Sequence, residues 1–355
     1  YGDHRYLHSF PTRRSSDLLE AIHRIGEDSS PLVMRQLPIP EPGSNAILMK
    51  VLACGVCHTE LDEIEGRTAP PSLPVIPGHQ VVGEVVALGE GSSRYSVGDR
   101  VGAAWIFSAC GSCLFCSTGR ENLCESFRAT GRDANGGYAE YMTIHENFAL
   151  PIPETMSGEE AAPLLCAGAI GYRALRLAGL TRGQRLGLMG FGASAHLVLK
   201  LVLHLYPEME VFAFARDEKE RAFARELGAV WAGGIQDECP ERLHAVIDTT
   251  PVWLPVLQSM ERLAPGGRLV INAIRKESVD QDVFRDLDYN RHLWMEKEIK
   301  SVANITRSDV TEFLTLTSKI PIKPEVQLFS LEEANQALRE IKGSKIRGAK
   351  VLRIG

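Results

Sequence analysis

Residues 185–196 read RLGLMGFGASAH, an apolar run that passes through glycines into an apolar helical pattern. Gly190, Gly192 and Ala195 form the spacing G-x-G-x-x-A. Between a strand and a helix, the first glycine permits a tight turn, the second lets the backbone approach a pyrophosphate, and the third small residue lets the helix pack on the strand. The helix start also offers unpaired N–H groups to phosphate. The spacing predicts a dinucleotide-binding turn, with an ordinary glycine turn as the alternative.

The sequence after this turn alternates between strand and helix patterns. The strand-like segments are VFAFA (211–215), AVIDTT (245–250) and GRLVINA (267–273). Helical patterns at 218–228 and 256–263 separate them. Such alternation is typical of β-α-β units, whose right-handed crossovers place helices on both faces of a parallel sheet. We therefore predict an α/β Rossmann domain with a doubly wound parallel sheet over residues 167–303.

The sequence before the turn has a different pattern. Short apolar runs such as AILMKVLACGV (46–56) and GYAEYMTIH (137–145) alternate with glycine- and proline-rich turn clusters. This pattern predicts a mostly-β domain with a closed, barrel-like sheet. The tail after about residue 304 is too short for a domain of its own. We expect it to complete the β domain, which would then comprise residues 19–166 and 304–355.

Residues 1–18 read YGDHRYLHSFPTRRSSDL and lack the apolar core and cleavage site of a secretory signal. Arginine and serine enrichment is typical of transit peptides, but Asp3, Asp17 and the missing amphipathic stripe argue against one. The stretch resembles the translation of a sequencing adapter. We expect a non-native, poorly ordered leader, with the native chain starting near Leu19.

Composition limits the classes of function. The 355 residues are 44% hydrophobic and 24% charged, as in globular proteins, and the formal net charge of −6 argues against a nucleic-acid-binding face. No apolar run approaches the ~20 residues that span a bilayer. Eight cysteines crowd into clusters instead of forming a disulfide scaffold, which indicates metal binding in a reducing compartment. We expect a cytoplasmic protein without nucleic-acid or membrane partners.

The segment CGSCLFCSTGRENLC places four cysteines at intervals of three, three and eight. They are Cys110, Cys113, Cys116 and Cys124. Four thiolates form a closed tetrahedral zinc site that leaves no position for substrate. Iron–sulfur ligation and disulfides are the alternatives, and the spacing favours structural zinc.

A second, looser set consists of Cys57 in ACGVCHTELD, His79 in IPGHQVVGE and Cys166 in PLLCAGAIGY. Two cysteines and one histidine leave the fourth position of a zinc ion free. A zinc ion in such a site lowers the pKa of a bound alcohol or polarises a bound carbonyl. Buried cysteines and a hydrogen-bonded histidine are the alternative.

In order along the chain, ACGVCHT, PGHQVVGEV, the four-cysteine segment, LLCAGAIGYRAL and GFGASAH resemble the zinc-dependent medium-chain alcohol dehydrogenases. The resemblance covers nearly all of residues 19–355. It implies a GroES-like β domain, a Rossmann domain and an active site in the cleft between them. It also implies that Cys57, His79 and Cys166 hold a catalytic zinc ion, and that the four-cysteine segment holds a structural one.

The resemblance assigns roles to three further residues. Thr59 matches the hydroxyl that relays the substrate proton. A hydroxyl suits this task because it can both accept and donate a hydrogen bond, and a turn-capping threonine is the alternative. His58 matches a residue that contacts cofactor phosphate, and a solvated histidine is the alternative. Trp105 resembles an aromatic residue that lines the pocket for small alcohols, and a core tryptophan is the alternative.

Two residues depart from the family pattern. Gln80 stands where the family usually has glutamate after the liganding histidine, which removes a charge beside the metal. Asp62 stands at or beside the position where many relatives place a histidine as the outer member of the proton relay. The route of the proton beyond Thr59 therefore stays open.

The end of the second Rossmann strand decides between NAD and NADP. Ala215 stands where NAD-using relatives carry aspartate, and Arg216 follows it. A guanidinium at this rim suits a 2′-phosphate, so NADP is favoured over NAD. Asp217 is an argument for NAD, because a small shift of the loop would bring its carboxylate to the ribose.

These features together predict a zinc-dependent alcohol dehydrogenase with two zinc ions per chain. It would move a hydride between an alcohol and NAD(P)⁺, giving an aldehyde or ketone, with the cofactor carrying the hydride. A non-catalytic NAD(P)H-binding protein and an enone or quinone reductase of the same superfamily are the alternatives. The family also implies a homo-oligomer, either a dimer or a tetramer.

Overall fold

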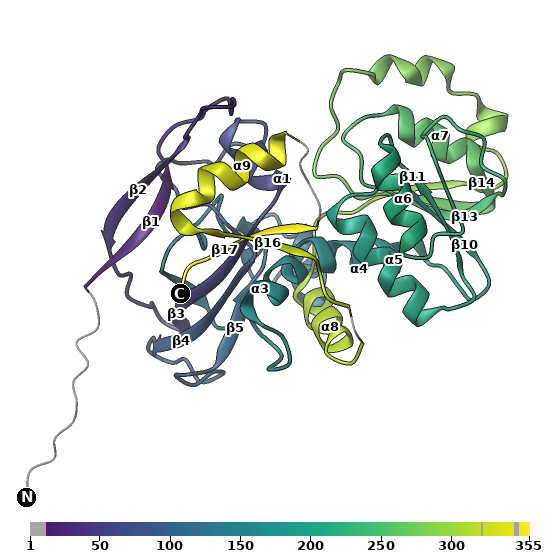
Figure 1. Cartoon of the computed structure of the whole chain (residues 1–355). Helices are drawn as coiled ribbons and strands as arrows, with labels where there is room; N and C mark the ends of the chain where they lie inside the picture. Colours follow the sequence, from purple (N-terminus) through teal and green to yellow (C-terminus); the bar gives the residue numbers. More distant parts are fainter. Residues whose placement is uncertain (1–11, 321, 344–347) are drawn as a thin grey trace, which may run out of the picture.

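The structure is a computed structural model that describes residues 12–320, 322–343 and 348–355. Two large β-sheets form the centres of two lobes that lie side by side (Figure 1). The lobe with the mostly antiparallel sheet is the first lobe below, and the lobe with the parallel sheet is the second. The predicted combination of a mostly-β part with an α/β part is confirmed.

The sheet of the second lobe has six parallel strands in the order β12-β11-β10-β13-β14-β15. In sequence order the bounds are β10 Arg185–Met189, β11 Glu210–Phe214, β12 Trp231–Gly233, β13 Leu243–Asp248, β14 Leu263–Ile271 and β15 Glu298–Ser301. With β10 as strand one, this order is 3-2-1-4-5-6, that of a Rossmann fold.

Helices cover this parallel sheet and explain its apolar strands. They are α4 (Ala167–Ala178), α5 (Ala193–Leu205), α6 (Glu218–Glu226) and α7 (Leu254–Arg262). Residues 186–189 of the central strand β10 are all buried, as expected for a parallel strand that is covered on both faces. The carboxyl end of β10 leads directly into the turn before α5, and ligands of open α/β sheets bind at this end of the strands.

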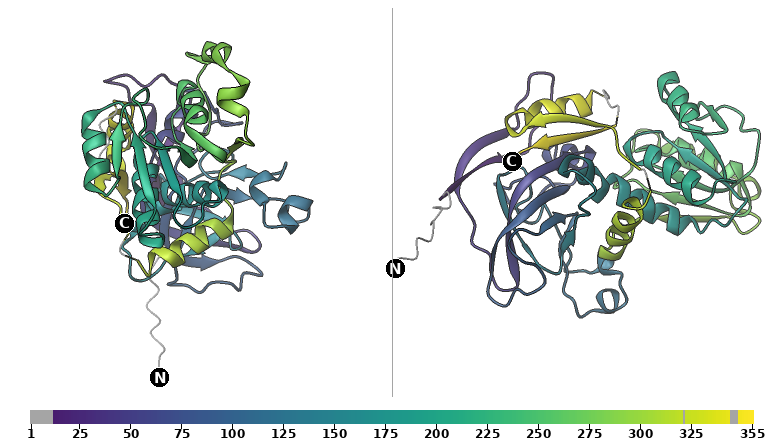
Figure 2. Two further views of the ribbon diagram at one scale, coloured as in Figure 1. Left: turned by 90° about the vertical axis from the view of Figure 1, so that its right-hand side faces the viewer. Right: turned by 60° about the horizontal axis from the view of Figure 1, so that its bottom comes forward.

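The first lobe contains a seven-stranded sheet in the order β16-β17-β3-β4-β5-β9, with β8 also paired to β3. The bounds are β3 Ala46–Val56, β4 Val81–Leu88, β5 Arg100–Ala103, β8 Tyr141–His145, β9 Ala149–Pro151, β16 Val326–Ser330 and β17 Ala349–Arg353. The last two strands come from the end of the chain, and β17 pairs antiparallel with β3. The right-hand view of Figure 2 shows these yellow strands along the first lobe.

Shorter elements complete the first lobe and its connections. They are β6 (Ile106–Ser108), β7 (Arg128–Ala129), α1 (His58–Ile64), α2 (Leu114–Ser117), α3 (Gly158–Ala161), α8 (Arg307–Thr317) and α9 (Ala334–Lys342). Helix α8 packs against α4 of the second lobe. The loop around α2, blue in Figure 2, projects from the lobe.

The expectation of a poorly ordered leader is wrong for residues 13–18. Residues Arg13–Leu19 form strand β1, which pairs antiparallel with β2 (Leu32–Pro38). Leu18 and Leu19 are buried in the core of the first lobe. Backbone pairing and these two leucines hold the segment, although RRSS has no strand-like alternation of apolar residues. The rest of the expected leader, residues 1–11, lies outside the described residues.

Candidate active site

The three scattered residues Cys57, His79 and Cys166 come together in the fold. The Nε2 atom of His79 lies 3.8 Å from the Sγ of Cys57 and 3.3 Å from the Sγ of Cys166. All three candidate ligand atoms lie within 4.8 Å of one another. Two sulfurs and one imidazole nitrogen form a donor set that suits zinc and leaves one tetrahedral position for a substrate. The residues present therefore fit a catalytic zinc ion.

Local structure presents each of these ligands at the end of an element. Cys57 is the N-cap of α1, and its Sγ accepts a hydrogen bond from the backbone N–H of Thr59 at 3.4 Å. Cys166 directly precedes α4, and His79 lies just before β4. The preceding Gly78 has φ +96, and a Cβ there would lie 2.4 Å from the ring of Tyr138. Only glycine therefore lets the chain bring His79 this close to the core.

The buried residue Glu60 lies beside His79, a contact that the sequence patterns did not predict. Its Oε1 lies 2.7 Å from Nδ1 of His79, and both side chains are almost completely buried. Burial alone would raise the pKa of Glu60, but the charge of His79 and its hydrogen bond lower that pKa below its ordinary value. A carboxylate on one ring nitrogen orients the imidazole and leaves the other nitrogen for metal. The spacing Cys-x-x-Glu at a helix start was the available signal.

The ring of Trp105 packs against the imidazole of His79. The two ring centroids lie 4.9 Å apart in an edge-to-face arrangement, and Trp105 is 4% exposed. The burial of Trp105 fits the alternative of a core tryptophan, and its packing on His79 places it beside a candidate zinc ligand. That it lines a substrate pocket stays a prediction.

Thr59 and His58 begin helix α1 beside Cys57. Thr59 is half-buried and His58 is exposed. Asp62, one turn further along, is held by two guanidinium groups: its Oδ1 accepts from Nε of Arg67 at 2.5 Å and from Nε of Arg275 at 3.1 Å. A carboxylate held in this way is poorly placed to replace the histidine of a proton relay.

The other departure, Gln80, lies buried behind the ligands. Its backbone carbonyl accepts from the N–H of Gly55 at 3.0 Å, and a Cβ at Gly55 would lie 2.6 Å from Oε1 of Gln80. Its Nε2 has no hydrogen-bond partner among the described residues. The neutral amide of Gln80 thus fills the space against Gly55, where the glutamate usual in the family would bring a charge.

The four cysteines of the second candidate site also converge. Their sulfur atoms, from Cys110, Cys113, Cys116 and Cys124, lie within 4.8 Å of one another. The N–H groups of residues 113 and 116 donate to the sulfurs of residues 110 and 113 at 3.3 and 3.5 Å. All eight cysteines of the chain are free, which is against the disulfide alternative. Four convergent sulfurs that accept backbone hydrogen bonds fit a closed zinc site.

The four-cysteine loop is anchored on the start of α8 and on the segment that leads into it. Glu121 is buried, and its Oε1 accepts from the backbone N–H of Arg307 at 2.9 Å and from its Nε at 3.0 Å. Nδ2 of Asn122 donates to the carbonyl of Ala303 at 2.7 Å. The loop therefore fixes the chain where it leaves β15 and enters α8.

The predicted dinucleotide turn lies where β10 meets α5. Gly190 has φ +84, and a Cβ there would lie 2.8 Å from Oγ1 of Thr249. Gly192 is the N-cap of α5 without a side-chain cap, and a Cβ at this position would meet nothing within 4 Å. Ala195 is buried against the sheet. The turn therefore combines free helix N–H groups with open space, as a bound pyrophosphate needs.

One hydrogen bond joins this turn to the open metal site. Oγ of Ser194, the second residue of α5 directly after the turn, donates to the carbonyl of Ala167 at 3.0 Å. Ala167 follows the candidate ligand Cys166 directly. The two sites predicted separately from sequence are thus neighbours in space.

The rim after β11 carries the residues that the sequence predicts to select the cofactor. Ala215 is buried, and Arg216 is exposed. Oδ1 of Asp217 caps α6 by accepting from the N–H of Lys219 at 2.7 Å. The carboxylate that would favour NAD is therefore engaged in capping.

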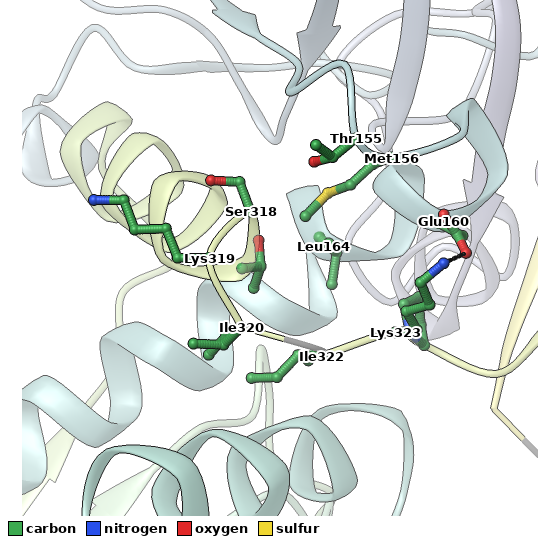
Figure 3. A pocket seen from close by; sticks show the side chains of 11 residues that line it. Thr155, Met156, Glu160, Leu164, Ser318, Lys319, Ile320, Ile322 and Lys323 are labelled. Carbon is green, nitrogen blue, oxygen red and sulfur yellow. Dashed lines mark hydrogen bonds and ion pairs between the residues drawn. The ribbon is translucent and has the colours of Figure 1, made fainter.

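A separate cavity of about 340 Å³ lies between the loop before α3 and the segment after α8 (Figure 3). Met156, Leu164 and Ile320 line it, and an ion pair between Glu160 and Lys323 borders it. None of the candidate zinc ligands lines this cavity.

Among the described residues, no helix has the length and apolar character required to cross a membrane.

Comparisons with known proteins place these features in context. Residues 43–154 match the alcohol dehydrogenase GroES-like domain. A probable alcohol dehydrogenase of Mycobacterium tuberculosis is 40% identical over 332 residues, which cover 92% of this chain and 94% of that protein.

Solved structures share the fold. The acetophenone reductase of Geotrichum candidum in complex with NAD has a TM-score of 0.84 at 24% identity, covering 97% of this chain and 98% of that chain. A protein of Helicobacter pylori named CAD, complexed with NADP(H), has a TM-score of 0.82 at 21% identity, covering 96% of this chain and 98% of that chain.

Proposed function

The chain belongs to the zinc-type medium-chain alcohol dehydrogenase family, and from that premise we propose which residues carry its alcohol–NAD(P) chemistry. Cys57, His79 and Cys166 hold the catalytic zinc ion, and the cofactor lies on the turn at Gly190 and Gly192. The observation that carries this proposal is the hydrogen bond from Ser194 to Ala167, because it puts the dinucleotide turn next to a metal ligand.

The side chains around the open site divide the remaining tasks. When bound, zinc supplies a Lewis acid that lowers the pKa of the alcohol, and NAD(P)⁺ accepts the hydride. Thr59 accepts the proton of the substrate hydroxyl, and Glu60 keeps His79 in the orientation of a ligand. Trp105 excludes water beside His79, and His58 at the start of α1 faces cofactor phosphate.

We propose NADP as the preferred cofactor. The exposed guanidinium of Arg216 offers paired donors to a 2′-phosphate, while Asp217 is occupied as the cap of α6. Replacing Arg216 with alanine should raise KM for NADP⁺ about ten-fold with little change for NAD⁺. Steady-state kinetics with both cofactors measure this, and equal effects on both would rule out the phosphate role.

The zinc assignment is tested by paired cysteine variants. Wild-type protein should contain two zinc ions per chain and reduce NADP⁺ with a primary alcohol. Cys166→Ser should retain the structural ion and lose activity at least about a hundred-fold. Cys239→Ser is the matched control, because Cys239 belongs to neither candidate site. It should retain both ions and full activity.

The same experiment separates the alternatives. Full activity after removal of the open-site zinc would reject the metal mechanism. Zinc-independent reduction of an enone would favour the reductase alternative, and cofactor binding without turnover of any alcohol would favour a non-catalytic protein.

We also propose that the protein acts as a homo-oligomer in the cytoplasm. Strand β15 is an edge of the parallel sheet, and its neighbourhood exposes Trp294, Met295 and Ile299. An exposed apolar edge strand favours pairing with a second copy. Eight free cysteines, six of them in the two candidate metal sites, suit a reducing compartment.

A further inference from the structure

Charged side chains form a continuous ion-pair chain across the two lobes. In order and with alternating sign, its members are Lys342, Glu65, Arg67, Asp62, Arg275 and Glu277. The first four belong to α9 and to α1 with its following turn, in the first lobe. The last two belong to the loop after β14, in the second lobe. The contact between Asp62 and Arg275 is therefore the step that crosses between the lobes.

The two sides of this crossing differ in what they carry. Asp62 lies on α1, one turn after His58 and Thr59, and its side chain is 8% exposed. Arg275 lies in residues 272–277, at the carboxyl edge of the parallel sheet. There the N–H of Asn272 donates to the carbonyl of Asp248 at 2.7 Å. The crossing thus joins the helix of the proton-accepting hydroxyl to the edge of the sheet on which a dinucleotide lies.

The loop that carries Arg275 is itself fixed to that edge. The buried Nζ of Lys276 lies 2.5 Å from Oδ2 of Asp248 and donates to the carbonyls of Thr250 and Val252 at 2.8 and 2.9 Å. A displacement of Arg275 would therefore also displace the ends of β13 and β14. The loop behaves as part of the second lobe rather than as an independent surface segment.

We propose that Arg275 and Asp62 form a latch that holds the two lobes together around the bound cofactor. The cofactor must contact the glycine turn in the second lobe and α1 in the first. A contact that keeps these surfaces together lowers the cost of ordering them when the cofactor binds. Asp62 is then a positioning residue, and its carboxylate serves Arg275 rather than the proton relay. This inference rests on the proposed binding of NAD(P) at the turn.

The latch is tested by cofactor affinity. In Arg275→Gln, the Kd for NADP⁺ should rise about five-fold, and KM for the cofactor should rise while kcat does not fall, because cofactor release becomes faster. Asp62→Asn should give the same change, and the double variant should be no worse than either single one. Quenching of tryptophan fluorescence measures Kd without turnover, and Arg275→Lys should restore part of the affinity.

Arg67→Gln is the matched control, because Arg67 holds the same carboxylate from within the first lobe. It should leave Kd close to that of the wild type. Circular dichroism verifies the folding of every variant. The side chain of Arg275 is 23% exposed and lies in a loop, so its variant remains informative if Asp62→Asn misfolds. Two results would overturn the latch. One is a Kd for NADP⁺ in Arg275→Gln that equals the Kd in Arg67→Gln. The other is a folded Asp62→Asn that binds cofactor as tightly as the wild type, since Arg275 would then act on the cofactor directly. Wild-type protein that binds neither NAD⁺ nor NADP⁺ would contradict the proposed function instead.

Discussion

The pairing of Glu60 with His79 shows how one buried carboxylate can orient a candidate metal ligand. Glu60 performs two tasks, because its Oε2 also accepts the N–H of Cys57 at 2.8 Å in the capping box of α1. The same side chain therefore starts the helix, fixes one ligand through the backbone and orients another through the ring. A sequence pattern cannot reveal that Glu60 orients His79, because His79 lies nineteen positions further along the chain.

We expect Glu60→Ala to weaken zinc binding at the open site by about 10- to 100-fold, because the imidazole loses its orienting partner. Glu60→Gln keeps a hydrogen-bond acceptor and should lose less. Competition with a chromophoric chelator measures the affinity. Zinc at the four-cysteine site, whose ligands do not contact Glu60, serves as the internal control. Equal zinc affinity in Glu60→Ala and wild type would contradict the orienting role.

At the scale of elements, strand β1 is the least suited to its surroundings. It buries Arg14, Ser16 and Asp17, and each has a side-chain atom without a hydrogen-bond partner among the described residues. Burial, together with the nearby charge of Glu332, raises the pKa of Asp17 to about 7. The strand is held by its backbone pairing and its leucines, while its polar side chains oppose it.

This raised pKa predicts how stability depends on pH. Between pH ~4 and ~7 the folded chain keeps a proton that the unfolded chain releases, so the free energy of unfolding falls as the pH rises through this window. Asp17→Asn should remove that fall and gain about 2 kcal/mol over the wild type at pH 8, with little difference at pH 4. Urea midpoints at the two pH values measure it. Parallel pH profiles for the two proteins would contradict the burial of a charged Asp17.

At the scale of the molecule, the two sheets end in edge strands of different character. Strand β15 is exposed along its length, and Ile299 within it is 47% exposed. Strand β16 ends the other sheet, and its Leu328 is 41% exposed. The further exposed apolar residues Trp294 and Met295 beside β15 are the reason for proposing the first edge as the contact with a second copy.

Ile299→Lys should therefore shift the protein toward monomers, because a buried lysine at a strand-pairing interface is unfavourable. Leu328→Lys, at the other edge, should leave the oligomeric state unchanged. Light scattering coupled to size-exclusion chromatography gives the mass of each variant. An unchanged mass for Ile299→Lys, or an equal loss in both variants, would place the interface elsewhere.

Local patterns were enough to predict several parts of this molecule. Glycine spacing at residues 190–195 and the strand–helix alternation after it predicted the Rossmann sheet, because turn geometry and crossover handedness follow from short segments. The cysteine spacing at 110–124 predicted a four-sulfur cluster, because this prediction also depends only on a short segment. Strand β1 was missed, because its backbone pairing needs no apolar alternation in its own sequence.

The amino-acid sequence by itself determined the two fold types, the glycine turn and the candidate sulfur and imidazole ligands, because each depends on residue chemistry in short segments. Only the tertiary structure decided that Glu60 meets His79, that Asp217 is used as a helix cap, and that Asp62 reaches Arg275 213 positions away. Such contacts depend on how separate elements pack, and packing is set by the burial of whole surfaces rather than by any local pattern.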